Sequence, residues 1–236
     1  MRRDDPACRE PAPRRALPAP PSRIVQVLGP LLTPRRLERI RTSIAARTRG
    51  VVLVLEDFAD PHNASAVLRS AEAFGVLEVH VVDPARRFRV AQRVSRGVDR
   101  WLEIERHTEP ETPIEALRAR GYRIVLAEPA GARSPQQVRE WPRVALVLGN
   151  EHRGPSDWMR AHADATCAIP MRGLVESLNV SVAAAVLLFA LMHDRPGDLS
   201  EAEREELLAR YLLDDVRDAE RLVLGAAAAS RADEAG

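Results

Sequence analysis

The sequence predicts an α/β fold in which helices cover both faces of a mostly parallel sheet. Short apolar runs alternate with amphipathic segments along most of the chain, and this alternation is typical of parallel sheets. Several runs are rich in β-branched residues and show no polar alternation, which indicates strands buried on both faces. The chain has 236 residues, enough for one such domain with additional segments at its ends.

The expected strands are short and are separated by helices or loops. They cover residues 51–55, 79–82, 101–104, 123–127 and 144–148, followed by a short apolar run that ends at Ile169, Pro170 and Met171. A helix is expected to begin at Asn63 as its N-cap and to end at Gly75, with Val67, Leu68, Ala71 and Phe74 on its apolar side. Further helices are expected over residues 114–120 and 180–192. Residues 83–100 should be an irregular basic stretch, and residues 128–142 a loop with one short helical turn.

The two ends of the chain are expected to form separate segments. Residues 1–50 hold twelve Arg and four acidic residues, a balance of +8, so the remainder carries −7 of the net charge of +1. Residues 1–22, rich in Pro, Arg and Ala, should be disordered. Residues 23–50 should form a basic helical segment that begins with Thr33 as N-cap and Pro34. Residues 51–195 hold the sheet, and residues 196–236 a helical extension with one helical pattern over residues 200–225.

Composition and missing motifs exclude several classes of site. The two cysteines, Cys8 and Cys167, can build neither a disulfide framework nor a zinc site, and we expect no metal. No apolar run is long enough to span a bilayer, so we expect a cytoplasmic protein without a membrane segment. The chain contains neither G-x-G-x-x-G nor a P-loop, and it has no Lys for the latter.

Polar residues gather where the apolar elements of residues 144–193 end. Gly149 and Glu151 follow a strand, and Ser177 and Asn179 precede a helix. Backbone groups left unpaired at such ends are where α/β proteins bind ligands. The residues alone leave a second interpretation open, in which the glycines shape a loop and the polar side chains cap the helix.

The amino-acid sequences of these segments resemble those of a known family. LGNEHRG at residues 148–154, IPM at 169–171, SLNVSVA at 177–183 and DPHNASAVLRSAEAFG at 60–75 are similar to motifs of the SPOUT RNA methyltransferases, specifically the TrmH-type ribose 2′-O-methyltransferases. The resemblance implies S-adenosylmethionine as cofactor, a C-terminal trefoil knot and a homodimer. None of these properties follows from composition or periodicity.

The resemblance also implies roles for individual residues. The implied catalytic residues are Arg69, Asn63, Glu151, Ser177 and Asn179, and the implied cofactor contacts are Leu126, Gly149, Ile169, Met171 and Leu178. Without the family, Arg69 would be a surface residue that pairs with Glu72, and the aliphatic residues would be ordinary core.

The resemblance favours tRNA as substrate, with guanosine 18 as the methylated nucleotide. The N-terminal helix would bind backbone phosphates through Arg35, Arg39, Arg41 and Arg49, although a basic amphipathic helix can also be a solvated face. The alternatives are a ribosomal-RNA 2′-O-methyltransferase and a non-catalytic RNA-binding relative. Two departures bear on the RNA: Glu176 stands where tRNA-type relatives usually have Gln, and His152 and Arg153 replace a pair that often contains Lys.

Overall fold

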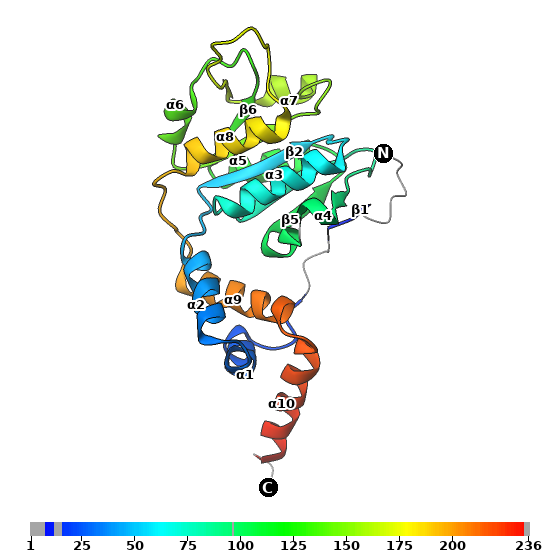
Figure 1. The fold of residues 1–236 in the computed structure, drawn as a ribbon, viewed down its shortest axis with the longest axis vertical. Helices are drawn as coiled ribbons and strands as arrows, with labels where there is room; N and C mark the ends of the chain where they lie inside the picture. Colours follow the sequence, from blue (N-terminus) through cyan, green and yellow to red (C-terminus); the bar gives the residue numbers. More distant parts are fainter. Residues whose placement is uncertain (1–7, 12–15, 96, 234–236) are drawn as a thin grey trace. The chain divides into compact units, whose positions relative to one another are not determined.

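The computed structural model describes residues 8–11, 16–95 and 97–233, and these residues form two compact units. One unit contains residues 8–11 and the described residues of 48–195. The other contains residues 16–47 and 196–233, drawn from both ends of the chain (Figure 1). Each unit is described separately.

A six-stranded sheet forms the centre of the larger unit. Its strands are β2 (Val51–Glu56), β3 (Glu78–Val82), β5 (Glu103–His107), β6 (Arg123–Ala127), β7 (Val144–Leu148) and β8 (Ala165–Cys167). They lie in the order β5-β3-β2-β7-β6-β8, and every pairing is parallel. The predicted mostly parallel sheet is therefore confirmed. Residues of β2, β3 and β7 are buried throughout, as expected for strands covered on both faces.

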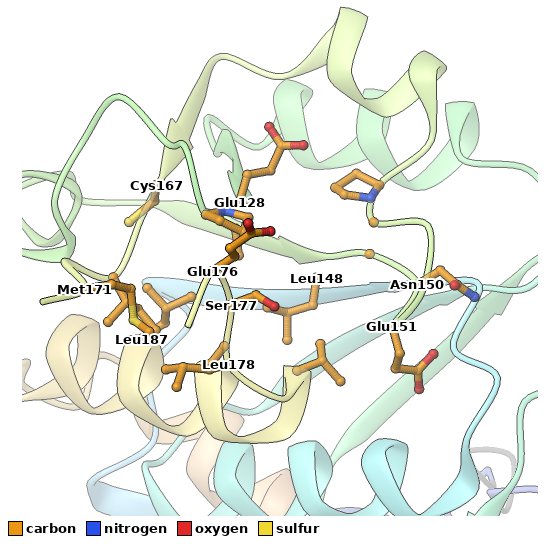
Figure 2. Close-up of a pocket in the computed structure, with 18 of the residues that line it drawn as sticks. Glu128, Leu148, Asn150, Glu151, Cys167, Met171, Glu176, Ser177, Leu178 and Leu187 are labelled. Carbon is orange, nitrogen blue, oxygen red and sulfur yellow. The ribbon is translucent and has the colours of Figure 1, made fainter. Parts of the chain in front are cut away.

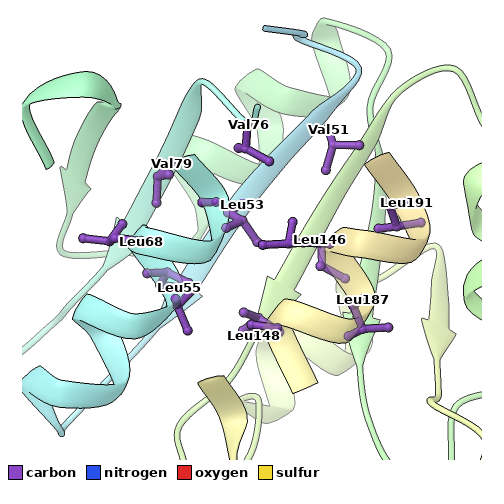
Figure 3. Close-up of a cluster of buried hydrophobic side chains, with 14 of the residues drawn as sticks. Val51, Leu53, Leu55, Leu68, Val76, Val79, Leu146, Leu148, Leu187 and Leu191 are labelled. Atoms are coloured by element: carbon purple, nitrogen blue, oxygen red, sulfur yellow. The ribbon is translucent and has the colours of Figure 1, made fainter. Parts of the chain in front are cut away.

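Helices cover both faces of this sheet. One hydrophobic cluster joins the sheet to α3 (Pro61–Ala73), α6 (Pro135–Arg139) and α8 (Val180–Met192), and a second joins it to α5 (Glu111–Ala119) and α7 (Asp157–His162). Figure 3 shows the first cluster, where Leu68 of α3 and Leu187 of α8 approach Leu53, Leu55 and Leu146 of the central strands. Both clusters are mainly aliphatic, with Phe58 and Phe88 in the first and Tyr122 in the second, which agrees with an aromatic content of 4%.

Several predicted boundaries differ from the structure. The N-cap of α3 is Asp60, whose Oδ1 accepts a hydrogen bond from the backbone N of His62 at 2.9 Å. The prediction that Asn63 is the N-cap was therefore wrong, because Pro61 already occupies the first turn. Strand β5 begins at Glu103 rather than at residue 101, and α5 begins at Glu111 rather than at residue 114.

Short elements also occur where the sequence predicted irregular chain. Residues 83–100 contain β4 (Val90–Ala91), α4 (Gln92–Ser95) and most of the 3₁₀ helix η2 (Val98–Trp101). Helix α7 was not predicted. It begins after Ser156, whose Oγ accepts from the backbone N of Met159 at 3.1 Å, and both the backbone N and the Oγ of Ser156 donate to buried Glu56 at 2.8 and 2.6 Å.

Part of the predicted disordered tail is ordered. Strand β1 (Cys8–Arg9) pairs antiparallel with β4, and Arg9 forms an ion pair with buried Asp99 at 2.6 Å. Glu10 pairs with Arg89 and Arg106. The prediction of disorder is therefore wrong for residues 8–11 and also for Pro21 and Ser22, which begin the helix α1 (Pro21–Leu28), whereas residues 1–7 and 12–15 lie outside the described part of the chain.

The smaller unit is helical. It contains α1 (Pro21–Leu28), the 3₁₀ helix η1 (Gly29–Leu31), α2 (Pro34–Ala45), α9 (Glu201–Asp215) and α10 (Ala219–Asp233). Thr33 caps α2 as predicted. The expected single pattern over residues 200–225 is instead two helices, separated at Asp218, whose φ is 56°.

The N-terminal and C-terminal helices of this unit are joined by charge as well as by apolar packing. Arg36 of α2 donates from Nε and Nη2 to the two carboxylate oxygens of Asp215 in α9, at 2.8 and 2.9 Å. This two-pronged geometry is the strongest form of an arginine–carboxylate pair, and it raises the pKa of Arg36. No helix in the described part of the chain is long and apolar enough to cross a bilayer.

Candidate functional site

The loop after β7 is held in shape by Asn150. Its backbone exchanges two hydrogen bonds with Gly154, at 3.1 and 2.8 Å. The side chain of Asn150 is buried: Nδ2 donates to the carbonyl of Asp57 at 2.7 Å, and Oδ1 accepts from the backbone N of His152 and Arg153 at 2.9 and 3.1 Å. Every polar atom of this side chain is therefore used to fix the loop. Sequence reasoning missed this role, although an Asn that precedes such a turn is a signal for it.

Gly149 is required by close packing within the same loop. A Cβ atom at this position would lie 2.2 Å from the backbone N of Pro155 and 2.4 Å from the backbone C of Gly154. These are main-chain atoms that cannot rotate away, so only glycine fits here.

Glu151 joins the loop to the start of α3. Its two carboxylate oxygens accept from the backbone N of Ala59 and of Asp60, each at 3.2 Å. Oε1 also accepts from Nδ2 of Asn63 at 3.4 Å. A carboxylate at a helix N-terminus is stabilised by the unpaired backbone N–H groups and by the helix dipole.

Asn179 joins a third segment to the same point. Its Oδ1 caps α8 by accepting from the backbone N and from Oγ of Ser181 at 2.9 and 2.6 Å, while its Nδ2 donates to Oδ1 of Asn63 at 3.1 Å. The three predicted residues Glu151, Asn63 and Asn179 thus form one chain of hydrogen bonds across three elements. Asn179 therefore caps α8, as one of the two interpretations expected, and it also contacts the predicted catalytic residue Asn63.

A cavity of about 260 Å³ opens beside these hydrogen-bonded residues, at the carboxyl ends of β6, β7 and β8 (Figure 2). Apolar side chains form much of its wall, and Leu148 and Leu187 are among them. Glu128, Glu176 and Ser177 add polar groups. The volume is near the lower end of the range for small-molecule sites, roughly 300–1,000 Å³, and the mixture of an apolar wall with a few polar groups is typical of them.

Four of the five predicted cofactor contacts line this cavity, namely Gly149, Ile169, Met171 and Leu178. Leu126 does not. It is fully buried in the hydrophobic cluster under α5 and α7, and the next residue, Ala127, lines the cavity instead. Successive side chains of a strand point to opposite faces, so a shift by one residue accounts for the error.

The remaining predicted catalytic residues lie differently. Ser177 and Glu151 line the cavity, whereas Arg69 does not. Arg69 is exposed on α3, and its Nη1 donates to the carbonyl of Val94 at 3.4 Å, which is a long hydrogen bond. The guanidinium therefore keeps most of its donors free for a ligand outside the cavity.

The predicted RNA-binding arginines divide into two groups. Arg35, Arg39 and Arg41 are exposed on α2. Arg49 belongs to the larger unit, where its Nη1 lies 3.3 Å from a carboxylate oxygen of Glu78 and 3.1 Å from one of Glu103. These two carboxylates make Arg49 a weak candidate for phosphate, contrary to expectation.

Cys167, at the end of β8, presents a neutral thiol to the cavity wall. Burial raises its pKa to about 11, and the thiolate is the reactive form. We expect iodoacetamide at pH 8 to label partly exposed Cys8 and to leave Cys167 unmodified in the native protein, as measured by mass spectrometry of peptides. Both thiols should react in urea. Equal labelling of the two cysteines without denaturant would contradict this assignment.

Comparison with known proteins links these features to one family. The family model described as SpoU rRNA Methylase family matches residues 50–189. A tRNA (guanosine(18)-2′-O)-methyltransferase of Thermus thermophilus is 36% identical over 164 residues, which cover 69% of this chain and 84% of the relative.

Two solved structures are similar to the fold. The Aquifex aeolicus TrmH/SpoU tRNA modifying enzyme superposes with a TM-score of 0.70 and 28% identity, covering 78% of this chain and 98% of that one. An AdoMet-bound rRNA methyltransferase from Sinorhizobium meliloti superposes with a TM-score of 0.54 and 26% identity, covering 64% of this chain and 59% of that one.

Proposed function

This chain belongs to the SpoU rRNA methylase family, and on that premise we propose that it methylates the ribose 2′-hydroxyl of guanosine 18 in tRNA, using S-adenosylmethionine. The main observation behind the proposal is that hydrogen bonds link Asn63 to Glu151 and to Asn179. These two bonds connect the segments that hold the family motifs, beside an apolar cavity. The similar Thermus enzyme is named for this reaction on tRNA.

The apolar and polar groups that line the cavity suit S-adenosylmethionine. Ile169 and Leu178 offer apolar surface for an adenine ring, and the absence of a side chain at Gly149 leaves the backbone of the loop accessible. Glu128, Glu176 and Ser177 offer acceptors for polar groups. When bound, S-adenosylmethionine supplies an electrophilic methyl group on a sulfonium. The AdoMet-bound rRNA methyltransferase with a similar fold supports this cofactor.

We also propose the trefoil knot that the family resemblance implies. The chain around Gly131 passes very close to β8, because a Cβ on Gly131 would lie 2.4 Å from the backbone C of Cys167. Arg133 exchanges backbone hydrogen bonds with Thr166 and Ala168, so this segment runs beside β8 before the chain continues to the loop of residues 170–179. Such tight contacts between loops support a threaded arrangement of residues 128–179.

Arg69 would act on the nucleophile by positioning it. A neutral guanidine costs about 7 kcal/mol at pH 7, since the pKa of Arg is about 12.5 and each unit is worth about 1.36 kcal/mol. Direct removal of the ribose proton by Arg69 is therefore unfavourable. Its exposed guanidinium would instead bind a phosphate of the RNA and orient the 2′-hydroxyl, whose proton passes to that phosphate or to water as the methyl group arrives.

The remaining motif residues would hold the site together. Asn63 would orient the ribose or Arg69, because it lies six residues before Arg69 on the same helix and contacts both Glu151 and Asn179. Ser177 would line the cofactor side. Glu151 would stabilise the loop on the N-terminus of α3 rather than exchange a proton.

A second copy of this chain is the partner we propose for α8. Val182, Val186 and Phe189 follow helical spacing along one stripe and are 48%, 41% and 54% exposed. Leu174 and Val175, in the preceding loop, add further exposed apolar surface. A continuous apolar patch of this kind marks an interface, and it lies next to the cavity through Val180 and Ala183.

Val186→Asp is expected to convert the dimer to a monomer of 26.1 kDa. A charge in the middle of an apolar interface must be desolvated without a partner, whereas the same charge on a free helix face stays in water. Light scattering after size exclusion measures the mass, and Leu31→Asp, an exposed apolar residue of η1, is the matched control. A wild-type protein that is already monomeric would exclude the dimer.

The RNA contacts we propose on the helical unit are Arg35, Arg39 and Arg41. Their replacement by Ala together should weaken tRNA binding and reduce the slope of log K against log salt by about 2–3, because each phosphate contact contributes about 0.7 for single strands and about 0.9 for B-DNA. Filter binding at several salt concentrations measures the slope. An unchanged slope would remove these residues from the interface.

Methyl transfer from labelled S-adenosylmethionine tests the function itself. We expect incorporation into total tRNA and not into ribosomal RNA, and none into a tRNA with 2′-deoxyguanosine at position 18. Incorporation into ribosomal RNA alone would favour the ribosomal-RNA 2′-O-methyltransferase. Glu176, His152 and Arg153, which differ from the residues usual in tRNA-type relatives, are the reason for testing it. Binding of tRNA without any transfer would identify a non-catalytic relative.

A cytoplasmic location of the protein remains a prediction.

A further inference from the structure

Two histidines and a glutamate meet at the edge of the sheet formed by β3 and β5. His80 lies on β3, and Glu105 and His107 lie on β5, where His80 pairs with Glu105 in the register of the two strands. In the strand order, β2 separates this edge from β7, β6 and β8, whose carboxyl ends border the cavity, and none of the three residues lines the cavity. The cluster is therefore not part of the site proposed above.

The three side chains point one ligand atom each at a common position. Nδ1 of His80 lies 2.9 Å from Nε2 of His107, and Oε2 of Glu105 lies 3.8 Å from the first atom and 4.0 Å from the second. A point about 2.1 Å from all three atoms exists between them, which matches zinc–nitrogen and zinc–oxygen distances of about 2.0–2.2 Å. This point lies in the plane of the three atoms, so a tetrahedral ion with a fourth ligand requires the two imidazole nitrogens to move slightly apart by side-chain rotation.

A neighbouring carboxylate prepares His80 for such a role. Oε1 of Glu78 lies 2.8 Å from Nε2 of His80, and both oxygens of Glu78 accept from Arg120, at 2.5 and 2.7 Å. A carboxylate held by Arg can only accept, so Nε2 of His80 carries the proton and Nδ1 directs its lone pair toward His107 and Glu105. A metal-binding histidine that donates its other N–H to a carboxylate is the usual arrangement at zinc sites.

Access to solvent is also suitable. His80 is buried and the His107 side chain is 16% exposed, whereas the Glu105 side chain is 63% exposed. An ion could therefore enter past Glu105 and keep water as its fourth ligand. The two cysteines gave no sign of a metal site, and His80 and His107 come together only through the parallel pairing of β3 and β5.

We propose that His80, Glu105 and His107 bind one zinc ion, which fastens the edge strand β5 to β3. The competing arrangement is a hydrogen bond between two neutral imidazoles, in which His107 donates to His80, with no affinity for metal. The proposal is independent of methyl transfer, and it can be tested whether or not the methyltransferase assignment holds.

The test uses the full chain without a histidine tag. Titration with Zn²⁺ in a calorimeter, and with Co²⁺ in a spectrophotometer, should give one ion per chain, and bound Co²⁺ should show the visible absorption of a four-coordinate site. Glu105→Gln and His107→Gln should each weaken Zn²⁺ binding at least tenfold. Exposed Glu105 can be changed without risk to folding, so its variant decides the result if His107→Gln is unstable.

His162→Gln is the matched control. His162 is an exposed histidine at the end of α7, stacked on Trp158, and its replacement should leave Zn²⁺ affinity unchanged. Absence of saturable one-to-one binding to the wild type would overturn the proposal. Affinity that is the same in the wild type and in Glu105→Gln would also overturn it, since the ion would then be held elsewhere.

Discussion

Replacement of Arg69 with alanine is expected to lower kcat for methyl transfer by about 10²- to 10⁴-fold, the range for loss of a group that orients a proton-transferring centre. Arg69 is exposed and makes only one long hydrogen bond, to Val94, so the fold should be unaffected. Arg69→Lys should retain part of the tRNA affinity but lose most turnover, because an ammonium is a point charge without the planar fork of a guanidinium.

Single-turnover kinetics with bound S-adenosylmethionine measures this loss separately from product release. Arg217→Ala is the control, since that arginine side chain is 97% exposed on the helical unit and lies 4.0 Å from its nearest carboxylate. Cofactor affinity should be the same in all three variants, because Arg69 does not line the cavity. Full activity of Arg69→Lys would show that charge alone is sufficient and would reject the positioning role.

Gly149→Ala is expected to weaken cofactor binding and to raise Kd by roughly 5- to 150-fold, because an extra carbon in a packed site costs about 1–3 kcal/mol and each 1.4 kcal/mol is about tenfold in Kd. The new Cβ would meet backbone atoms of Pro155 and Gly154 at 2.2 and 2.4 Å, so the loop must move. That movement would also strain the bonds of Asn150, and we expect a loss of about 1–3 kcal/mol in the free energy of unfolding.

Calorimetry with S-adenosylmethionine and urea unfolding measure the two effects. Gly173→Ala is the matched control in the neighbouring loop, because a Cβ at Gly173 would meet nothing within 4 Å. If Gly149→Ala bound the cofactor as tightly as the wild type, the loop after β7 would not belong to the cofactor site.

The sequence predicted those elements whose residues carry a strong local signal. Strands β6 and β7 were bounded correctly because their apolar runs are continuous, and α8 because Asn179 caps an apolar run that starts at once. Strand β5 was displaced because its sequence, EIERH, is polar at an edge and offers no apolar run. Helix α7 is a six-residue helix whose stability depends on Ser156 and on distant Glu56, which no local pattern reveals.

Predictions for the candidate site depended on the family motifs more than on physical pattern. Periodicity could place Asn63 near a helix start, but it missed the stronger cap at Asp60, followed by proline. It could not show that Asn63 contacts both Glu151 and Asn179, because these residues are separated by 88 and 116 positions. Leu126 was named through the resemblance, but its side chain is buried on the opposite face of β6 from the cavity, which the neighbouring residue Ala127 lines.

The helical unit is built from two segments that lie before and after the sheet in the sequence, and this order matters during synthesis on the ribosome. Residues 16–47 are translated before the six-stranded sheet, whereas their partners in α9 and α10 are translated after it. At about 5–20 residues per second, the first helices wait roughly 8–40 seconds for residue 201. The parallel strands therefore have that interval to pair before Arg36 can meet Asp215.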